Sequence, residues 1–317
     1  MFLSILFHIQ TIAFSGGNNL KIAAPEAKVY RTKNVIVVVV DGPRYSETWG
    51  SKNQEHIPRM AHDLAKAGVI NTAFYNTGPT YTNAGHAAIT TGFYQQINNA
   101  GRELPRNPNF MQLWLQHRGN SNNKAWIVTS KDKLHILADT RNKTYHGKFL
   151  PMINCGINGP GSGYRTDSVT LRISRQILQQ EKPNLLLVNF KEPDSRAHSN
   201  DWEGYLQGIK TTDEYVYQLW KFLEEDEHYR GTTTLIVTND HGRHPDGHAD
   251  GFVSHGDKCQ GCRHLNFYAS GPDFKKNTIL KTSYNQTDIP VTIAELLGFR
   301  IPKSKGKIMW ELFSEKP

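Results

Sequence analysis

The chain has 317 residues, 38% of them hydrophobic and 10% aromatic, which is enough for a substantial core in one large domain or two small ones. Lysine and arginine outnumber aspartate and glutamate by 37 to 29, for a net charge of +8, but no run of five like charges occurs. We therefore expect no nucleic-acid polymer as a partner, only a diffuse positive field that attracts small anions weakly.

The first segment, MFLSILFHIQTIAFS, is largely apolar but too short and too interrupted by His8 and Gln10 to span a bilayer. We interpret residues 1–20 as a signal or leader segment, although no lysine or arginine precedes the apolar stretch. This interpretation predicts a periplasmic or secreted protein. A wrongly assigned start or a non-native leader is the alternative, and the protein would then be cytoplasmic. We expect no transmembrane segment elsewhere in the chain.

From residue 34 onward, β-branched apolar runs alternate with amphipathic segments. Strands are predicted at 34–40, 125–130, 184–190, 234–239 and 265–270. Helices are predicted at 56–68, 167–180, 202–225 and 287–298. The alternation predicts an α/β fold, a three-layer α/β/α sandwich with a mostly parallel central sheet. We expect one domain over residues 34–317, with a glycine-rich surface insertion near residues 140–166.

Acidic residues and histidines follow three of the predicted strands. These residues are Asp41, Asp194, His198, Asp240 and His241. In an open parallel sheet the carboxyl ends of the strands share one edge, where ligands bind. Carboxylates and imidazoles are ligands of zinc and other first-row metals, so a metal site is predicted there. A later histidine completes it, and spacing alone leaves four candidates: His244, His248, His255 and His264.

The segment TYTNAGHAAITTG, residues 80–92, gives Thr82 two interpretations. Thr82 could cap the helix that the alanine-rich continuation predicts. It could also be a nucleophile, because a helix N-terminus stabilises an anion and a divalent metal can hold a hydroxyl as its alkoxide.

Five motifs in order resemble the alkaline phosphatase superfamily, especially the nucleotide pyrophosphatase/phosphodiesterases and the Thr-dependent alkaline phosphatases. They are VVVVDG, PTYTNAGHAAITTGFY, EPDSRAH, TNDHG and SHG, between Asn34 and Leu312. The segment TDIPVTIAELLG also resembles the C-terminal helix that this superfamily shares with the sulfatases. One such motif would be weak, but five in the same order are specific.

The resemblance implies two zinc ions, one or both replaceable by another divalent metal. One ion would be held by Asp194, His198 and His255, with His248 as the fallback for the third ligand. The other would be held by Asp41, Asp240, His241 and the oxygen of Thr82, the implied nucleophile. The implied substrate-binding residues are Asn99, preferred over Asn98, together with Lys131 and Lys133. Lys133 stands where the family has an arginine, which weakens the implied phosphoryl clamp.

We therefore expect a zinc-dependent phosphohydrolase that cleaves small-molecule phosphate esters through a phospho-threonine. The two lysines favour a phosphomonoesterase, and a type I phosphodiesterase or nucleotide pyrophosphatase is the alternative. A phosphotransferase or mutase would use the same site. A sulfatase-like hydrolase is less favoured, because sulfatases have a Cys/Ser-x-Pro-x-Arg nucleophile motif that this sequence lacks. A non-catalytic binding module would have lost ligands that are present here. The sequence does not determine the oligomeric state.

The C-x-x-C motif at Cys259 and Cys262 has three interpretations. With export to an oxidising compartment we favour a local disulfide. It could also be half of a structural zinc site with His264, or a pair of reduced thiols. His86, within the Thr82 motif, is interpreted as structural.

Overall fold

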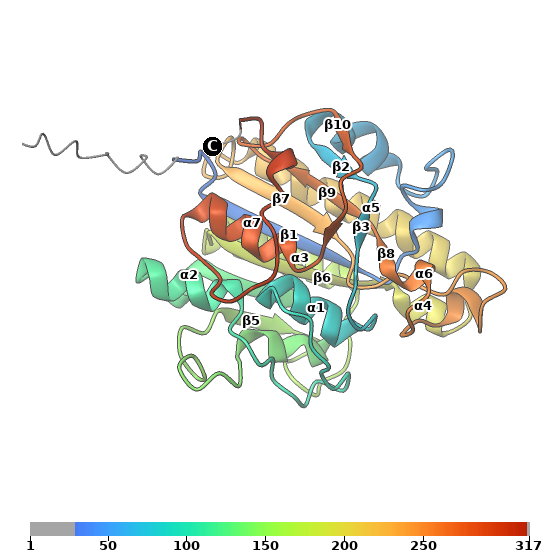
Figure 1. Ribbon diagram of the computed structural model, residues 1–317, viewed down its shortest axis with the longest axis horizontal. Coiled ribbons are helices and arrows are strands. Elements are labelled where there is room, and N and C mark those ends of the chain that lie inside the picture. Colours follow the sequence, from blue (N-terminus) through green and yellow to red (C-terminus); the bar gives the residue numbers. More distant parts are fainter. Residues whose placement is uncertain (1–28, 316–317) are drawn as a thin grey trace, which may run out of the picture.

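The computed structural model describes residues 29–315, so the predicted leader at 1–20 lies outside the described residues. The molecule is built on an eight-stranded sheet with the order β10-β2-β9-β7-β1-β6-β4-β5 (Figure 1). Its strands are β1 (Asn34–Asp41), β2 (Val69–Asn71), β4 (Ala125–Thr129), β5 (Met152–Cys155), β6 (Leu185–Pro193), β7 (Thr233–Thr238), β9 (Phe267–Ser270) and β10 (Thr278–Leu280). A small second sheet has the order β11 (Tyr284–Asn285), β3 (Phe74–Tyr75), β8 (His264–Leu265).

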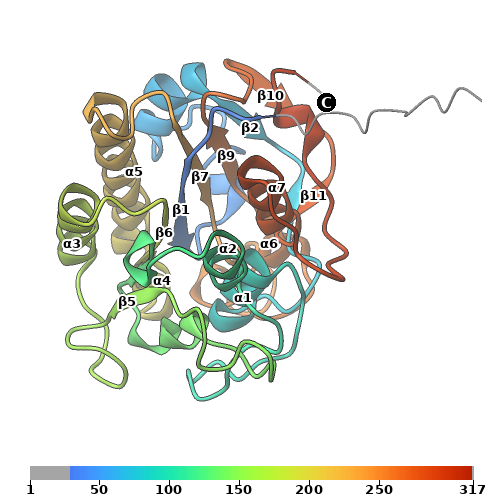
Figure 2. The ribbon, with the colours of Figure 1, turned by 90° about the vertical axis from the view of Figure 1, so that its left-hand side faces the viewer.

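Helices cover both faces of the large sheet (Figure 2). One face packs against α1 (Thr82–Thr91), α2 (Phe110–Arg118) and α7 (Asp288–Leu297), and the other against α3 (Asp167–Gln180) and α5 (Trp202–Glu225). Two short helices are α4 (Asp194–His198) and α6 (Gln260–Arg263). Single 3-10 or π turns lie at Tyr45–Glu47, Met60–Leu64, Ala65–Ala67, Asn122–Lys124, Asp132–Ala138, Gly251–Val253 and Trp310–Leu312. The predicted three-layer α/β/α architecture is confirmed. Within residues 29–315, no helix has the length and apolar character needed to cross a bilayer.

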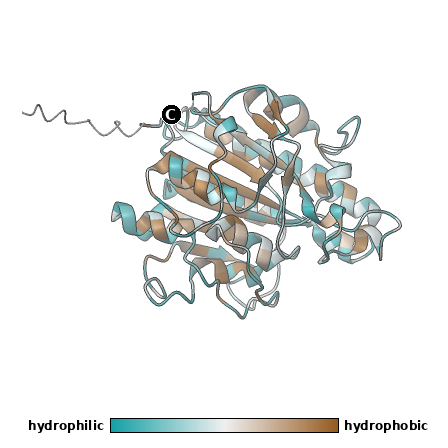
Figure 3. Ribbon diagram, viewed as in Figure 1, coloured by the Kyte–Doolittle hydropathy of each residue, from teal (hydrophilic) through white to brown (hydrophobic). Residues whose placement is uncertain are grey.

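The alternation of side chains along β1 explains the two cores. Val35, Val37 and Val39 point into the core under α1, α2 and α7, whereas Ile36 and Val38 point into the core under α3 and α5. Both faces of the strand are buried, which is why its sequence is an uninterrupted apolar run (Figure 3).

Three elements differ from the sequence-based expectation. The strand at 265–270 splits into β8 and β9, and β9 runs antiparallel to β7, so its carboxyl end points away from the edge where β1, β6 and β7 end. The helix predicted at 56–68 is present as a continuous but irregular helical segment over residues 58–67, α-helical at 58–59, π-helical at Met60–Leu64 and 3-10 at Ala65–Ala67. The stretch 140–166 is not merely an insertion, because its residues 152–155 form β5, which pairs with β4 at the edge of the sheet.

The strand order places the site. β1 lies between β6 and β7 and is parallel to both, so Val39 is opposite Asn189 on one side and Thr238 on the other. The carboxyl ends of these three strands therefore meet at one edge of the sheet.

Candidate active site

Three buried carboxylates lie at this edge of the sheet. Asp41 is the last residue of β1, Asp194 is the first residue of α4 directly after β6, and Asp240 follows β7 by two residues. All three are at most 3% exposed. The segment after Asp41 needs a glycine, because Gly42 has a φ of +71° and a Cβ there would lie 2.8 Å from the guanidinium of Arg243.

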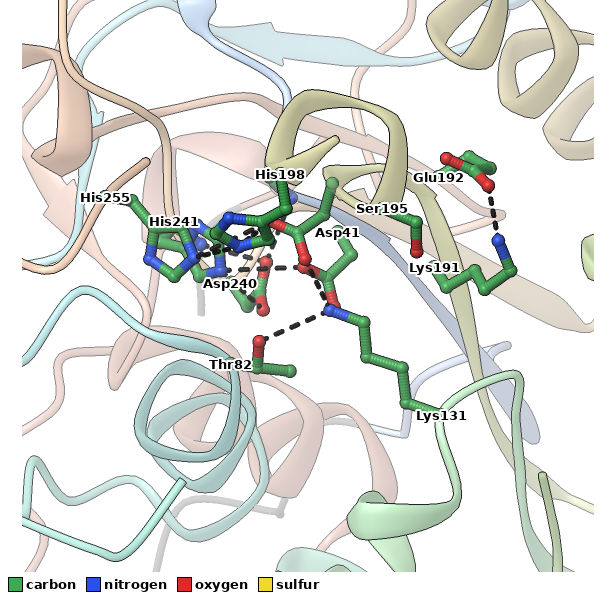
Figure 4. Close-up of polar contacts among 12 residues, drawn as sticks. Asp41, Thr82, Lys131, Lys191, Glu192, Ser195, His198, Asp240, His241 and His255 are labelled. Carbon is green, nitrogen blue, oxygen red and sulfur yellow. Dashed lines mark hydrogen bonds and ion pairs between the residues drawn. The ribbon is translucent and has the colours of Figure 1, made fainter. Parts of the chain in front are cut away.

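Asp41, Asp240 and His241 form the first ligand group (Figure 4). Nε2 of His241 lies 3.5 Å from Oδ1 of Asp41 and 3.4 Å from Oδ2 of Asp240. Its Nδ1 is 2.9 Å from the carbonyl oxygen of Gly242, to which it donates when Nε2 is unprotonated and free to bind a metal. Three atoms face one another here: Oδ1 of Asp41, Oδ2 of Asp240 and Nε2 of His241. All three are buried and have no hydrogen-bond partner among the described residues. A divalent cation between them would satisfy all three, so this donor set fits a metal ion.

Asp194, His198 and His255 form the second ligand group. The Nε2 atoms of His198 and His255 are 3.1 Å apart, and Oδ1 of Asp194 lies 3.3 and 3.6 Å from them. Nδ1 of His255 is 2.8 Å from the carbonyl oxygen of Thr80, which directs Nε2 toward Asp194. Burial, and then the charge that His241 carries when protonated, lower the pKa of His255 well below its usual value, so its imidazole is neutral. The two rings are stacked, with their centroids 3.6 Å apart. His248, the fallback ligand, lies elsewhere, with Nε2 2.6 Å from Asp257.

Thr82 is the first residue of α1, and its hydroxyl faces these groups (Figure 4). The N-cap position belongs to Tyr81, whose side chain makes no capping hydrogen bond, so the interpretation of Thr82 as a helix cap is wrong. Oγ1 of Thr82 lies 3.4 Å from Nζ of Lys131. Oδ1 of Asn99 accepts the next backbone N–H of the helix, that of Asn83, at 3.0 Å. The hydroxyl thus stands at a helix N-terminus without a structural role of its own.

Two neighbouring residues hold α1 in this position. A Cβ at Gly85 would lie 2.3 Å from the carbonyl oxygen of Asp240, so only glycine allows the helix to pack so closely against the segment after β7. Nδ1 of His86 lies 2.9 Å from the carbonyl oxygen of Thr82 and 3.3 Å from Oδ2 of Asp240, and its Nε2 contacts Asn189 at 3.2 Å. This placement is consistent with the structural interpretation of His86.

Lys131 lies between the two ligand groups. Its Nζ is 2.8 Å from Oδ2 of Asp41 and 2.6 Å from Oδ2 of Asp194. Burial alone would raise the pKa of Asp41, but Lys131 and His241 hold it at about 2. Burial opposes the charge of Lys131, yet Asp194 and Asp41 raise its pKa above the usual lysine value. The ammonium is therefore a fixed positive charge beside Thr82, engaged with carboxylates rather than free for substrate alone.

Lys133 is half-buried, and its Nζ lies 3.3 Å from Oδ1 of Asn99. Burial, and then the charge of Lys131, lower the pKa of Lys133 to about 8. The structure thus brings together the three predicted substrate-binding side chains, with Asn99 linking Lys133 to the start of α1.

The sequence analysis missed Arg243. Its side chain is fully buried, and its guanidinium pairs with Asp194, donates to the carbonyl oxygens of Phe252 and Val253, and lies 3.4 Å from Nδ1 of His198. The sequence feature that could have identified Arg243 as a site residue is its position two residues after His241. Because Asp194 already has Lys131 and Arg243 as partners, the first ligand group fits a metal ion better than the second.

An open hollow of about 480 Å³ leads to the second ligand group. It is lined by Tyr81, Ile97, Asn98, Asn99, His198, Ser254, His255 and Gly256. The hollow therefore offers both polar groups and the apolar surfaces of Tyr81 and Ile97 to a bound molecule.

Comparison with known proteins identifies the family. The sulfatase family model matches residues 33–299. The chain belongs to the sulfatase family. This match and the folds described next confirm the predicted membership of the alkaline phosphatase superfamily. The protein is accordingly a hydrolase of a metal-dependent superfamily whose members act on phosphate or sulfate esters. No curated protein sequence matches the chain.

Several solved structures share the fold. A phosphonate monoester hydrolase from Silicibacter pomeroyi superposes with a TM-score of 0.66 at 14% identity, covering 90% of this chain and 77% of that one. Murine ectonucleotide pyrophosphatase/phosphodiesterase 5 superposes with a TM-score of 0.64 at 16% identity, covering 89% of this chain and 100% of that one. The PsFucS1 sulfatase from Pseudoalteromonas sp. superposes with a TM-score of 0.60 at 15% identity, covering 84% of this chain and 68% of that one. At these identities the likeness concerns the fold, so substrate and metal must be argued from the site.

Proposed function

We propose that this protein is a zinc-dependent phosphoric ester hydrolase that acts through a phospho-threonine at Thr82 and prefers monoesters. The observation that carries the proposal is the position of the Thr82 hydroxyl. This hydroxyl makes no capping hydrogen bond and stands at the N-terminus of the buried helix α1. Its oxygen lies 3.4 Å from the buried ammonium of Lys131. It also faces the first ligand group, whose three facing atoms have no hydrogen-bond partner among the described residues.

Two zinc ions are proposed, held by the residues of the two ligand groups, with Thr82 as an additional oxygen ligand at the first. When bound, the metals lower the pKa of the nucleophilic hydroxyl and neutralise charge on the phosphoryl group and the leaving oxygen. We expect the first ligand group to bind its metal more tightly, because Lys131 and Arg243 compete for Asp194.

The side chains have distinct roles in the proposed reaction. Oγ1 of Thr82 gives its proton to solvent and attacks phosphorus in line, forming an O–P bond as the bond to the alcohol oxygen breaks. The leaving alcoholate takes one proton from solvent, so this half-reaction leaves no net change in protons. The backbone N–H groups at the start of α1, the ammonium of Lys131 and the pair of Lys133 and Asn99 stabilise the non-bridging oxygens. Water then attacks phosphorus, the bond between phosphorus and Oγ1 of Thr82 breaks, one proton of that water passes to Oγ1, and inorganic phosphate leaves.

The preference for monoesters follows from charge. A monoester dianion carries more charge than a diester and gains more from the two lysines near Thr82. A diesterase is the second candidate, favoured by the hollow, where Tyr81 and Ile97 could contact a second substituent on phosphorus. The murine phosphodiesterase with this fold has also been solved as an inactive threonine-to-alanine variant in complex with AMP. A sulfatase would need a cysteine or serine where this chain has Thr82.

The first test is the variant Thr82→Ala. We expect hydrolysis of nitrophenyl phosphate to fall by on the order of a thousandfold or more, with metal content and melting temperature nearly unchanged. Thr82→Ser is the matched control and should retain measurable turnover and a trapped phosphoryl-enzyme. A Thr82→Ala enzyme with near-native rates would overturn the assignment of the nucleophile.

The second test compares substrates on the zinc-loaded protein. Nitrophenyl phosphate, its bis ester, a nitrophenyl phosphonate and nitrophenyl sulfate differ in charge and in the reacting atom but share one leaving group. We expect the highest kcat/KM for the monoester. A bis ester hydrolysed faster would favour the diesterase, and a sulfate hydrolysed faster would contradict the phosphohydrolase proposal.

A further inference from the structure

A second group of metal-type side chains lies outside the catalytic residues. His244, Asp257, Cys259 and Cys262, named here the thiol cluster, each offer one ligand atom, and these four atoms all lie within 4.8 Å of one another. The cluster belongs to the loop between β7 and β8 and includes the start of α6 (Figure 1). Two cysteines, a histidine and a carboxylate are donors that zinc binds in four-coordinate sites.

His244 is oriented as a metal ligand would be. Its side chain is 9% exposed, and Nδ1 lies 2.8 Å from Oδ1 of Asp250, to which it donates in the tautomer with free Nε2. A carboxylate that holds one imidazole nitrogen in this way leaves the other free to bind a metal. Nε2 of His244 is buried, has no hydrogen-bond partner among the described residues, and lies 3.6 Å from Oδ2 of Asp257.

The two cysteines are arranged around the same point. Cys259 is the N-cap of α6, and its Sγ accepts the backbone N–H of Cys262 at 3.4 Å. Such an N–H group supports a thiolate at the first position of a C-x-x-C turn. Asp257 is fixed by the backbone N–H of Cys259 at 2.9 Å and by Nε2 of His248 at 2.6 Å.

Two of the three sequence-based interpretations of the motif, the local disulfide and the zinc site with His264, do not fit this geometry. The structure has Cys259 and Cys262 as free thiols, so the favoured disulfide is wrong. His264, the expected histidine partner, is engaged elsewhere: its ring stacks on Tyr45 at 3.8 Å, and its Nε2 contacts the carbonyl oxygen of Thr72 at 3.0 Å.

We propose that the thiol cluster is a structural zinc site, with Nε2 of His244, the two cysteine sulfurs and the carboxylate of Asp257 as ligands. On binding, each thiol gives up its proton to solvent and the sulfur lone pair forms the bond to the metal. The ligand set has no open position for a substrate, so its role is to brace the chain rather than to take part in catalysis.

The braced segment reaches both ligand groups of the active site. The backbone N–H of Gly242, next to Arg243, donates to the carbonyl oxygen of Cys262 at 2.9 Å. Oγ1 of Thr80 donates to the carbonyl oxygen of Asp257 at 2.6 Å, and the carbonyl oxygen of Thr80 accepts from His255. Zinc in the thiol cluster therefore fixes the loop that carries Arg243 and His255 and the segment that leads into Thr82.

The test uses the full chain purified under reducing conditions and loaded with Co²⁺ or Zn²⁺. The double variant Cys259→Ser/Cys262→Ser should lose about one metal per chain and the thiolate-to-cobalt charge-transfer absorption in the near ultraviolet. His244→Gln, which keeps both thiols, should weaken metal retention by about tenfold or more and alter that absorption. Cys155→Ser and His264→Gln are the matched controls, and both should keep the full metal content and the absorption.

Two outcomes would overturn the proposal. One is a Cys259→Ser/Cys262→Ser variant with unchanged metal content and no charge-transfer absorption in the parent protein. The other is a protein whose Cys259 and Cys262 resist alkylation until a reductant is added, which would show a disulfide. Because His244→Gln and the cobalt spectrum report on the cluster without removing a cysteine, the proposal remains testable if the double variant fails to fold.

Discussion

At the level of single residues, the site is a balance between three buried carboxylates and two buried cations. Asp41, Asp194 and Asp240 would repel one another, and Lys131 together with Arg243 offsets that repulsion at Asp194 and at one oxygen of Asp41. Oδ1 of Asp41 and Oδ2 of Asp240 face Nε2 of His241, and these three buried atoms have no hydrogen-bond partner among the described residues. We therefore expect a divalent cation to bind at the first ligand group.

Lys133 gives a prediction for the pH dependence. A lysine is charged below its pKa, and this one has a pKa lowered to about 8 by burial and by Lys131. We expect kcat/KM for nitrophenyl phosphate to fall as the pH rises through about 8, because the phosphoryl group then loses a cation. In Lys133→Arg the guanidinium stays charged, so the alkaline limb should move to higher pH.

The pH profile of Lys133→Met provides the control for this prediction. It should show KM raised roughly tenfold near neutral pH, since a charge-assisted hydrogen bond is lost. An alkaline limb at the same pH in the parent and in Lys133→Arg would show that another group titrates there, and would contradict the role given to Lys133.

At the level of elements, α1 connects Thr82, the proposed nucleophile, to the end of β7. All ten of its residues are buried, and Gly85 allows its backbone to approach the carbonyl oxygen of Asp240. The hydrogen bonds of His86 join the same two segments. The distance between Thr82 and the first ligand group is thus set by the packing of a whole helix.

Gly85→Ala tests this packing. Helix propensity alone predicts a gain in stability of about 0.5–1 kcal/mol when alanine replaces a mid-helix glycine. A Cβ located 2.3 Å from the Asp240 carbonyl oxygen must instead push α1 away, so we expect a loss of about 1–3 kcal/mol and a lower kcat. Denaturant unfolding and steady-state kinetics measure both quantities. A more stable, fully active variant would contradict the close approach.

At the level of the whole molecule, the two ligand groups of the active site are assembled from segments far apart in the chain. The first ligand group joins β1 to the end of β7, and the second joins the end of β6 to the loop that follows β7. A metal ion that binds only where these segments meet stabilises the folded chain and has little affinity for the unfolded one.

Metal removal should therefore lower the melting temperature. Saturating zinc at about a thousand times its Kd contributes roughly 4 kcal/mol, so we expect chelation to lower the melting temperature by on the order of 10 °C and zinc to restore it. The variant Cys259→Ser/Cys262→Ser lacks the metal site of the thiol cluster, so any effect of a chelator on it reports on the two ligand groups. We expect chelation to lower the melting temperature of this variant as well. Identical melting curves with and without chelator in that variant would argue against metal binding at the ligand groups.

Much of the fold follows from local pattern. The helices at 167–180 and 202–225 begin and end where the sequence predicted, because their apolar spacing and terminal residues define them locally. The antiparallel direction of β9 and the pairing of β5 with β4 were not predicted, since strand direction and edge pairing depend on partners distant in the chain. The helix expected at 56–68 shows that apolar spacing alone does not ensure a regular α-helix.

The sequence by itself determined which candidate residues gather at the site, because motif order and the buried strand β1 restrict the acidic residues, the histidines and Thr82 to one edge of a parallel sheet. Only the tertiary structure decided how they are paired. It placed His255 rather than His248 beside Asp194, put Tyr81 rather than Thr82 at the N-cap, and brought His244 instead of His264 to the two cysteines. These choices rest on side-chain directions in long loops, which the packing of the surrounding elements fixes and residue spacing does not.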